Sequence, residues 1–390
     1  MAIVTSGGQT TRFTYFLDNP VRGDQFSQTD DRVILGGNAV HTQAVHALGT
    51  DHTVRIGVQT RTDLINGLGL YHTQARARFA TVRQDDVGET ANGVYVEGES
   101  HWTPMFRSVL GIRGDGYTFR VNSNLAENSG YRTAGIVSPK ASLIYAPSAT
   151  TEFYLSGGYG FHSNDARGTT IRVDPSTGDP ASRVNPLVRS AGAEVGMRVS
   201  PLEAVRSTVS AWLLNLDSEL LFTGDAGITE PSAASRRRGV TFANFYRPLP
   251  TVSIDADASL SRARFVGVGA ERTSVPGALE NVIATGVTYE PRGAGIFTSV
   301  RLRHFGSYPL LEDNTLRAPA SNLVNGEGGY LLRSGTRLQL SILNLLNGRA
   351  DDIQYAYPSR LRGEVSDGVN DVHFHPVEPR QVRLAVDYKF

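Results

Sequence analysis

The most constraining feature of this sequence is a regular series of short segments in which apolar and polar residues alternate. Side chains alternate between the two faces of a β-strand, so such segments predict strands with one apolar face. The stretch 252–261 is a clear case, because Val252, Ile254 and Leu260 alternate with Ser253 and Asp255. About sixteen strands of roughly ten to fifteen residues follow from this pattern. They are expected near 8–18, 29–45, 52–63, 89–102, 106–121, 134–146, 151–163, 187–199, 205–221, 235–247, 251–265, 277–290, 295–306, 321–332, 336–347 and 379–390.

The connections between these segments alternate between short and long. Short turns such as 146–150, 247–250 and 290–293 alternate with long polar loops. The long loops are expected near 19–28, 64–88, 122–133, 164–186, 222–234, 266–276, 307–320 and 348–378. This alternation places all turns at one end of the sheet and all loops at the other, as in outer-membrane barrels. The predicted fold is therefore all-β, an antiparallel transmembrane β-barrel of outer-membrane type.

Composition excludes several other classes of protein. The 38 basic and 38 acidic residues leave no formal net charge, which argues against a nucleic-acid partner. The chain has no cysteine, so disulfides, thiolate metal sites and thiol nucleophiles are excluded. No apolar run approaches the ~18 residues of a membrane-spanning helix. Residues 1–8 contain neither a charged n-region nor an apolar h-region, so no signal peptide is expected.

The last ten residues show the two faces of a barrel strand. The even-numbered positions are apolar and end in Tyr388 and Phe390, whereas the odd-numbered positions include Arg383 and Asp387. We expect the even face to contact lipid and the odd face to line the lumen, with the strand pairing to 336–347. A soluble edge strand could show the same alternation.

Several motifs, in order along nearly the whole chain, resemble the barrel domain of TonB-dependent outer-membrane receptors. They are YFLDNP (15–20), GDQF (23–26), SPKASL (138–143), TEFYL (151–155), GFHSNDARG (160–168), LDSELL (216–221), SRRRGV (235–240), LNLLN (343–347), YPSR (357–360) and HFHPVEPR (373–380). The terminal aromatic residues Tyr388 and Phe390 resemble the signal that the barrel-assembly machinery reads in such proteins.

The resemblance implies a location in the Gram-negative outer membrane, among its lipids and lipopolysaccharide, and active uptake of a scarce, bulky nutrient. The ligand would be a siderophore, another metal chelate, a cobalamin or an oligosaccharide, captured by extracellular loops. The inner-membrane TonB complex would supply the work through a plug domain. No enzymatic activity and no bound cofactor are expected.

The chain differs from the family pattern in lacking a recognisable TonB box, plug domain and signal peptide. It also shows about sixteen strands where such transporters have 22. We therefore expect 1–390 to be a single, partial β-barrel domain, the C-terminal portion of a receptor. Two alternatives stay open: a passive porin-like channel, and a soluble β-rich binding protein that uses the loop around 373–375.

Candidate ligand-binding residues lie in two places. The last long loop carries Asp351, Asp352, Tyr355, Tyr357 and Arg360, and tyrosine and arginine are frequent binding anchors. The densest basic run, Arg236, Arg237 and Arg238, could meet an anionic ligand or lipopolysaccharide phosphate. In both places the alternative is an ordinary solvated loop or strand end.

Other polar residues are candidates for a metal site and for the lumen wall. His373 and His375 would share one face of an extended segment near Asp371 and Glu378, which suits either a transition metal or packing against neighbouring loops. Six charged residues are expected to face the lumen: Asp255, Asp257, Arg301, Arg303, Arg383 and Asp387. A hydrolase built on His162, Ser163 and Asp165 is not expected, because the sequence has no Gly-x-Ser-x-Gly elbow.

Overall fold

The computed structural model describes residues 2–10, 15–223 and 228–388. Sixteen strands form one antiparallel sheet, which confirms the predicted barrel wall and the number of its strands. The strands of this sheet are β1 (Ala2–Thr10), β2 (Phe26–Ala47), β3 (Thr50–Gln74), β4 (Ala77–Thr103), β5 (Phe106–Ser123), β6 (Gly130–Ser148), β7 (Thr151–Ser163), β8 (Leu187–Val199), β9 (Val205–Leu216), β12 (Ser235–Leu249), β13 (Val252–Phe265), β14 (Asn281–Tyr289), β15 (Gly295–Phe305), β18 (Ser321–Leu331), β19 (Arg337–Leu343) and β22 (Gln381–Asp387).

The sheet is a meander in which each strand pairs with the strands before and after it in the main sheet, from β1 at one edge to β22 at the other. β22 pairs with β19, as the sequence predicts. Three loops carry small hairpins of their own: β10 (Leu220–Thr223) with β11 (Ile228–Pro231), β16 (Tyr308–Pro309) with β17 (Arg317–Ala318), and β20 (Asp351–Ser359) with β21 (Val369–Pro376). Within the described residues the helical elements are α1 (Ala166–Thr170) and the 3-10 turn η1 (Ala126–Asn128).

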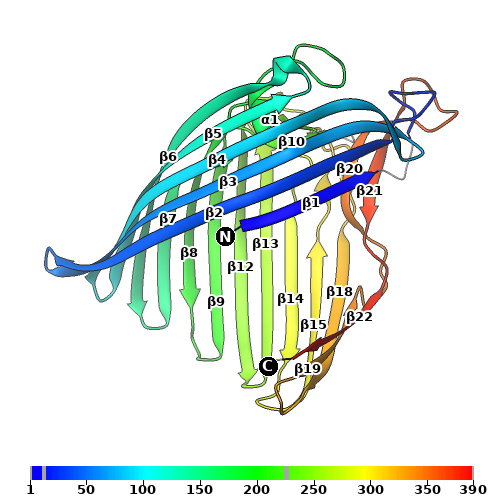
Figure 1. Ribbon diagram of the computed structural model, residues 1–390. Helices are drawn as coiled ribbons and strands as arrows, with labels where there is room; N and C mark the ends of the chain where they lie inside the picture. The colour runs from blue at the N-terminus through cyan, green and yellow to red at the C-terminus, as the bar shows by residue number, and fades with distance from the viewer. Residues whose placement is uncertain (1, 11–14, 224–227, 389–390) are drawn as a thin grey trace.

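The two ends of the sheet differ as predicted. The short turns lie together at one end, whereas α1 and the hairpins β10–β11 and β20–β21 lie at the other (Figure 1). We call these the turn end and the loop end. The turn between β2 and β3 consists of Leu48 and Gly49, both with positive φ (54° and 73°), the geometry of a tight hairpin turn.

One face of the sheet is an apolar surface exposed to the surroundings. Cross-strand partners share a face, and following the register shows that exposed apolar residues stand beside one another on strand after strand. Paired examples on this face are Ile56–Val96–Ile112, Leu143–Leu155–Val195, Val240–Leu260, Val287–Val300 and Leu338–Val386. We call this the outward face; its composition suits contact with hydrocarbon.

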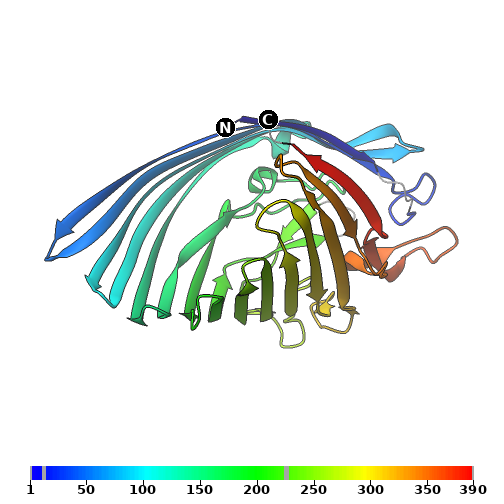
Figure 2. The ribbon, with the colours of Figure 1, turned by 90° about the horizontal axis from the view of Figure 1, so that it is seen from below.

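The opposite, concave face holds the buried apolar core. The sheet curves around the segment that contains α1 (Figure 2). The buried cluster under this segment includes Phe119, Val121, Ile136 and Leu187 of the sheet together with Ala166 of α1. No helix in the described part of the chain is long and apolar enough to cross a membrane.

Several expected boundaries were wrong; the strand expected at 205–221, for example, ends at Leu216. The predicted loop 64–88 is instead the far part of a long hairpin, because β3 and β4 continue to a tight turn at Ala75 and Arg76, which have positive φ. Register shifts in this part of the ladder disrupt the alternation that would have indicated strands. The first strand, expected at 8–18, is β1 at Ala2–Thr10; Tyr15 to Asp18 lie outside any strand, and 11–14 are outside the described residues.

Candidate functional site

The concave face carries chains of ion pairs near the turn end. Glu99 binds Arg107 at 3.3 Å, Arg107 binds Glu152 at 2.6 Å, and Glu152 binds Arg198 at 2.5 Å, so the charges cross from β4 to β8. Glu97 is similarly held by Arg55 and Lys140, at 3.0 and 2.5 Å. Alternating charges of this kind give a polar wall without a large excess of either sign.

The register places the six residues expected in the lumen on this same concave face. Asp255 binds Arg301 across two strands at 2.6 Å. Asp257 and Arg303 are both opposite Ala284 of β14, which lies between their strands. Arg383 is opposite Ser341, and Asp387 is opposite Arg337.

A segment inside the curve of the sheet follows β7. Residues 164–186 were expected to form an outer loop, but they fold onto the concave face and cover Phe119, which is 0% exposed. Asn128 fixes the segment, because its side chain accepts hydrogen bonds from Arg172 N (2.9 Å) and Val173 N (3.0 Å) and donates one to Val173 O (2.9 Å). We call residues 164–186 the inner segment.

Asp165 begins the helix of the inner segment. Its carboxylate accepts from the backbone N–H of Arg167 at 2.8 Å and binds the Arg167 guanidinium at 2.6 Å. Desolvation inside the curve of the sheet acts to raise the pKa of Asp165, although its side chain is 44% exposed. The side-chain hydrogen bond and charge of Arg167 outweigh desolvation, so this pKa lies below its ordinary value.

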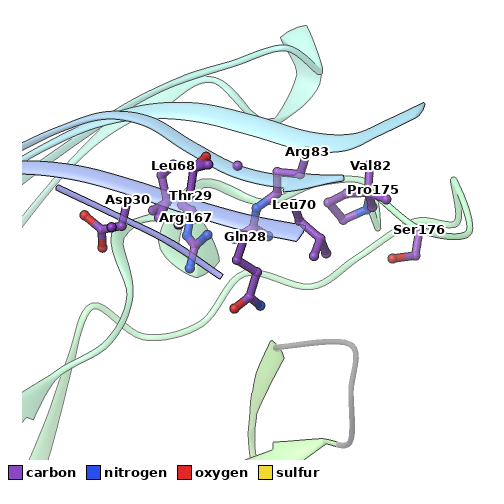
Figure 3. Close-up of a pocket in the computed structure, with 13 residues that line it drawn as sticks. Gln28, Thr29, Asp30, Leu68, Leu70, Val82, Arg83, Arg167, Pro175 and Ser176 are labelled. Carbon is purple, nitrogen blue, oxygen red and sulfur yellow. The ribbon is translucent and has the colours of Figure 1, made fainter. Parts of the chain in front are cut away.

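A cavity of about 510 Å³ lies between the inner segment and the first strands (Figure 3). Arg83 and Arg167 line it with Asp30, and Pro175 and Ser176 complete the wall from the inner segment. Arg83 is itself bound to the buried Asp85 at 2.8 Å. Both arginines therefore already have carboxylate partners, which reduces the positive charge available to an anionic ligand in this cavity.

The last long loop folds as the hairpin β20–β21 and packs against the segment that precedes β2. Phe16 N donates to Arg360 O at 2.8 Å, and the Arg360 guanidinium donates to Phe16 O at 3.3 Å. Asp24 holds the other side of the contact by accepting from Leu17 N and Asn19 N, both at 2.7 Å. Arg360, predicted as a ligand anchor, thus joins two loops that are more than 340 positions apart.

His373 lies inside this loop contact. Its ring stacks on Tyr357 with centroids 3.7 Å apart, and its Nδ1 lies 3.1 Å from the Tyr15 hydroxyl. Burial raises the pKa of Tyr355 in the same hairpin. In the described residues no group of three or more His, Cys, Asp or Glu side chains could hold a metal ion. The loop-packing alternative accounts for the surroundings of His373, and a metal site at His373 and His375 stays a prediction.

A second cavity, of about 320 Å³, brings several predicted residues together beneath this hairpin. Asp352 and His375 come from the hairpin, Glu378 from the loop that follows, and Arg383 from the last strand. The Arg303 guanidinium lies 3.8 Å from Asp352 Oδ1. Apolar lining is supplied by Leu323, Leu343, Pro376 and Val377. We call this the hairpin cavity. Asn325, Asn344 and Gln381 add further polar groups, so the walls of this cavity are both polar and apolar. Convergent polar groups in a partly apolar hollow are typical of ligand sites.

The arginine run is divided between the two faces of β12. Arg237 points to the concave side and binds Glu219 at 2.8 Å. Arg236 and Arg238 are exposed on the outward face, and Arg236 Nε donates to Asn215 Oδ1 at 2.9 Å. The predicted set is therefore not one site. Among the residues of the assembly signal, Tyr388 is exposed, and Phe390 lies outside the described residues.

Residues 4–345 match the family described as TonB dependent receptor-like, beta-barrel, which is most of the chain. The chain belongs to the TonB-dependent receptor β-barrel family. Members of this family are transport receptors of the Gram-negative outer membrane, which fits the expectation of a chain without enzymatic activity.

Solved structures of TonB-dependent receptors share this fold. The ferric-catecholate import receptor Fiu from E. coli K12 has a TM-score of 0.67 at 14% identity, over 92% of this chain and 55% of that one. The ferric yersiniabactin uptake receptor FyuA from Yersinia pestis has a TM-score of 0.64 at 15% identity, over 92% of this chain and 54% of that one. The copper transporter OprC has a TM-score of 0.71 at 13% identity, over 100% of this chain and 62% of that one. The chain thus spans a little over half of the length of these structures. A search of curated protein sequences gave no match.

Proposed function

We propose that this barrel belongs to an outer-membrane receptor that takes up a metal chelate, with a siderophore as the leading class. In a receptor of this family, energy from the TonB complex would reach the ligand through a plug domain. Solved relatives include a siderophore receptor, a ferric citrate transporter and a copper transporter, and these three ligand classes guide the choice of candidates here.

The hairpin cavity is the observation that carries this proposal. Arg383 lines the cavity and can hydrogen-bond to the oxygen atoms of an anionic chelate, while Asp352 and Glu378 can accept from its hydroxyl or amine groups. At about 320 Å³ the cavity is near the lower end of ligand pockets. A bulky chelate would therefore be held by one edge, with the rest in the lumen.

The proposal is tested by titrating the purified full chain in detergent with ferric catecholate, ferric citrate, a copper(II) complex, cobalamin and a maltooligosaccharide. We expect calorimetry to detect one metal chelate, and Arg383→Ala to weaken its binding at least tenfold. Arg198→Ala is the matched control, because it removes an arginine from the same face at the turn end. Binding of the sugar alone, or equal loss in both variants, would contradict the proposal.

A passive channel is the second candidate, and the number of strands favours it. Barrels of 16 to 18 strands in the porin class enclose a water-filled channel, and the main sheet here has sixteen. Planar-bilayer recordings distinguish the two functions. A steady, ohmic current across a bilayer that contains the full chain would support the channel. The absence of such a current would support the receptor.

A further inference from the structure

Four arginines form a compact group on the outward face of β12 and β13, strands that stand side by side (Figure 1). Arg238 is directly opposite Arg262, and Arg236 is directly opposite Arg264. We call these four residues the rim arginines. Opposite positions on antiparallel strands bring Cβ atoms to about 5 Å, and like charges there destabilise the pair. Two such pairs in succession therefore favour binding of a counter-anion.

The rim arginines stand directly next to the apolar outward face. The next pair along the same face is Val240 and Leu260, which are 48% and 64% exposed. Two residues along a strand correspond to about 7 Å, so the positive charge begins within one side-chain length of the hydrocarbon-like surface. β12 begins at Ser235, which places the rim arginines at the loop end.

The acidic residues that the structure describes leave this group without a direct ion pair. No described carboxylate lies within ion-pair distance of a rim arginine; Arg236 binds Asn215 at 2.9 Å, and Arg264 Nη1 donates to Ala263 O at 3.1 Å. Glu280, which lies near the end of β13, attracts Arg264 electrostatically, but its ion pair is with Arg317, at 2.5 Å. The contrast with Arg237 is direct, since that neighbour faces inward and has its own carboxylate.

We propose that the rim arginines bind the phosphate groups of lipopolysaccharide in the outer leaflet, with its acyl chains lying along Val240 and Leu260. Guanidinium groups bind phosphate bidentately, and the adjacent apolar face suits a ligand that has phosphates and acyl chains in one molecule. The assignment of the loop end to the outer leaflet follows the orientation of outer-membrane barrels. The lipid site therefore depends on one part of the proposed function, the location in the outer membrane. It does not depend on which nutrient the receptor takes up.

The test measures lipopolysaccharide binding to the purified full chain in detergent, with dephosphorylated lipopolysaccharide and inorganic phosphate as probes. We expect Arg238→Gln with Arg262→Gln to weaken lipopolysaccharide binding at least tenfold, and Arg236→Gln with Arg264→Gln to weaken it similarly. Arg247→Gln with Arg333→Gln is the control, because it removes the same charge at the turn end and should leave binding unchanged. Far-UV circular dichroism and heat-modifiable gel migration verify that each variant is folded.

Unchanged lipopolysaccharide binding in either folded rim variant would overturn the proposal, as would equal binding of the dephosphorylated lipid. Tight binding of inorganic phosphate without binding of the lipid would also overturn it, because that result describes a soluble-anion site. Chelate binding at the hairpin cavity should be unaffected by the rim variants. The lipid site and the proposed uptake function can therefore fail independently.

Discussion

The imidazole ring of His373 lies face to face with the ring of Tyr357, with 3.7 Å between the centroids and 9° between the planes. The stack fixes the hairpin β20–β21 in a position where the Tyr15 hydroxyl also reaches His373. Segments next to the two edge strands of the sheet are thereby joined at the loop end.

Removing this stack should release the two loops from each other. His373→Ala is expected to weaken the docking of the two loops by about 1–3 kcal/mol of free energy, because it removes an aromatic pair and a side-chain hydrogen bond. Hydrogen exchange of 15–24 and 351–376 measures the effect. His373→Phe keeps the stack and should retain part of the protection, and the exposed Phe374→Ser is the control. Equal exchange in wild type and His373→Ala would contradict this role.

The inner segment should depend on Phe119. Phe119→Ala leaves a cavity at a fully buried position, for which losses of 3–5 kcal/mol are typical. We expect proteolysis within 164–186 to become faster. Leu110→Ala, on the outward face of the same strand, is the matched control and should leave cleavage of this segment unchanged. If both variants are cleaved at the same rate, the inner segment is not anchored by Phe119.

Lowering the pH should weaken the docking of the inner segment on the sheet, because the Asp165 carboxylate becomes protonated. The pKa of this carboxyl is lower in the docked segment than the ordinary value of about 3.9. Because the pKa of Asp165 is lower in the docked segment, its ionised carboxylate stabilises docking at any pH above the ordinary pKa. This stabilisation is lost as the pH falls through the lower pKa of the docked segment. Protection from proteolysis by an acid-stable protease should therefore be constant from about pH 8 to 5 and fall below about pH 4.

Asp165→Asn isolates the charge in that experiment, because asparagine is also a good helix N-cap. The variant should be less protected at neutral pH, and its protection should change less between pH 5 and 3. A profile identical to that of the wild type would assign the acid transition to other groups.

A charge on the outward face should oppose insertion into the membrane. Val300→Arg places a guanidinium on the exposed apolar face of β15 and is expected to cost about 2–4 kcal/mol if the position is near the bilayer midplane. Ser299→Arg, the adjacent residue on the concave face, is the control. Folding into lipid vesicles at increasing urea measures the difference, and equal destabilisation would argue against a lipid-facing Val300.

The wall of the barrel could be predicted from the sequence because its signal is local. Alternation within β7 (Thr151–Ser163) and β8 (Leu187–Val199) gave the observed boundaries without error. The same rule failed over 64–88, since register shifts and a tight turn at Ala75 and Arg76 disrupt the period of two.

The contacts of the inner segment and of the loops could not be predicted from local alternation. The contact of Phe119 with Ala166, and that of Tyr15 with His373, join segments far apart in the sequence and leave no periodic pattern. The hairpin cavity itself was not predicted. Asp352, His375 and Arg383 were each identified by residue type, but their convergence depends on the fold of the last loop. The inner segment had one local signal, Asp165 as the N-cap of a short helix.

Site-specific labelling across β7 tests the central claim, that the two faces of this sheet meet lipid and water. The chain has no native cysteine, so Leu155→Cys and Ser156→Cys each introduce a single thiol, on the outward and the concave face. In membranes we predict that a lipid-soluble thiol reagent labels Leu155→Cys and a water-soluble reagent labels Ser156→Cys. Equal labelling of both positions by the water-soluble reagent would contradict a transmembrane barrel.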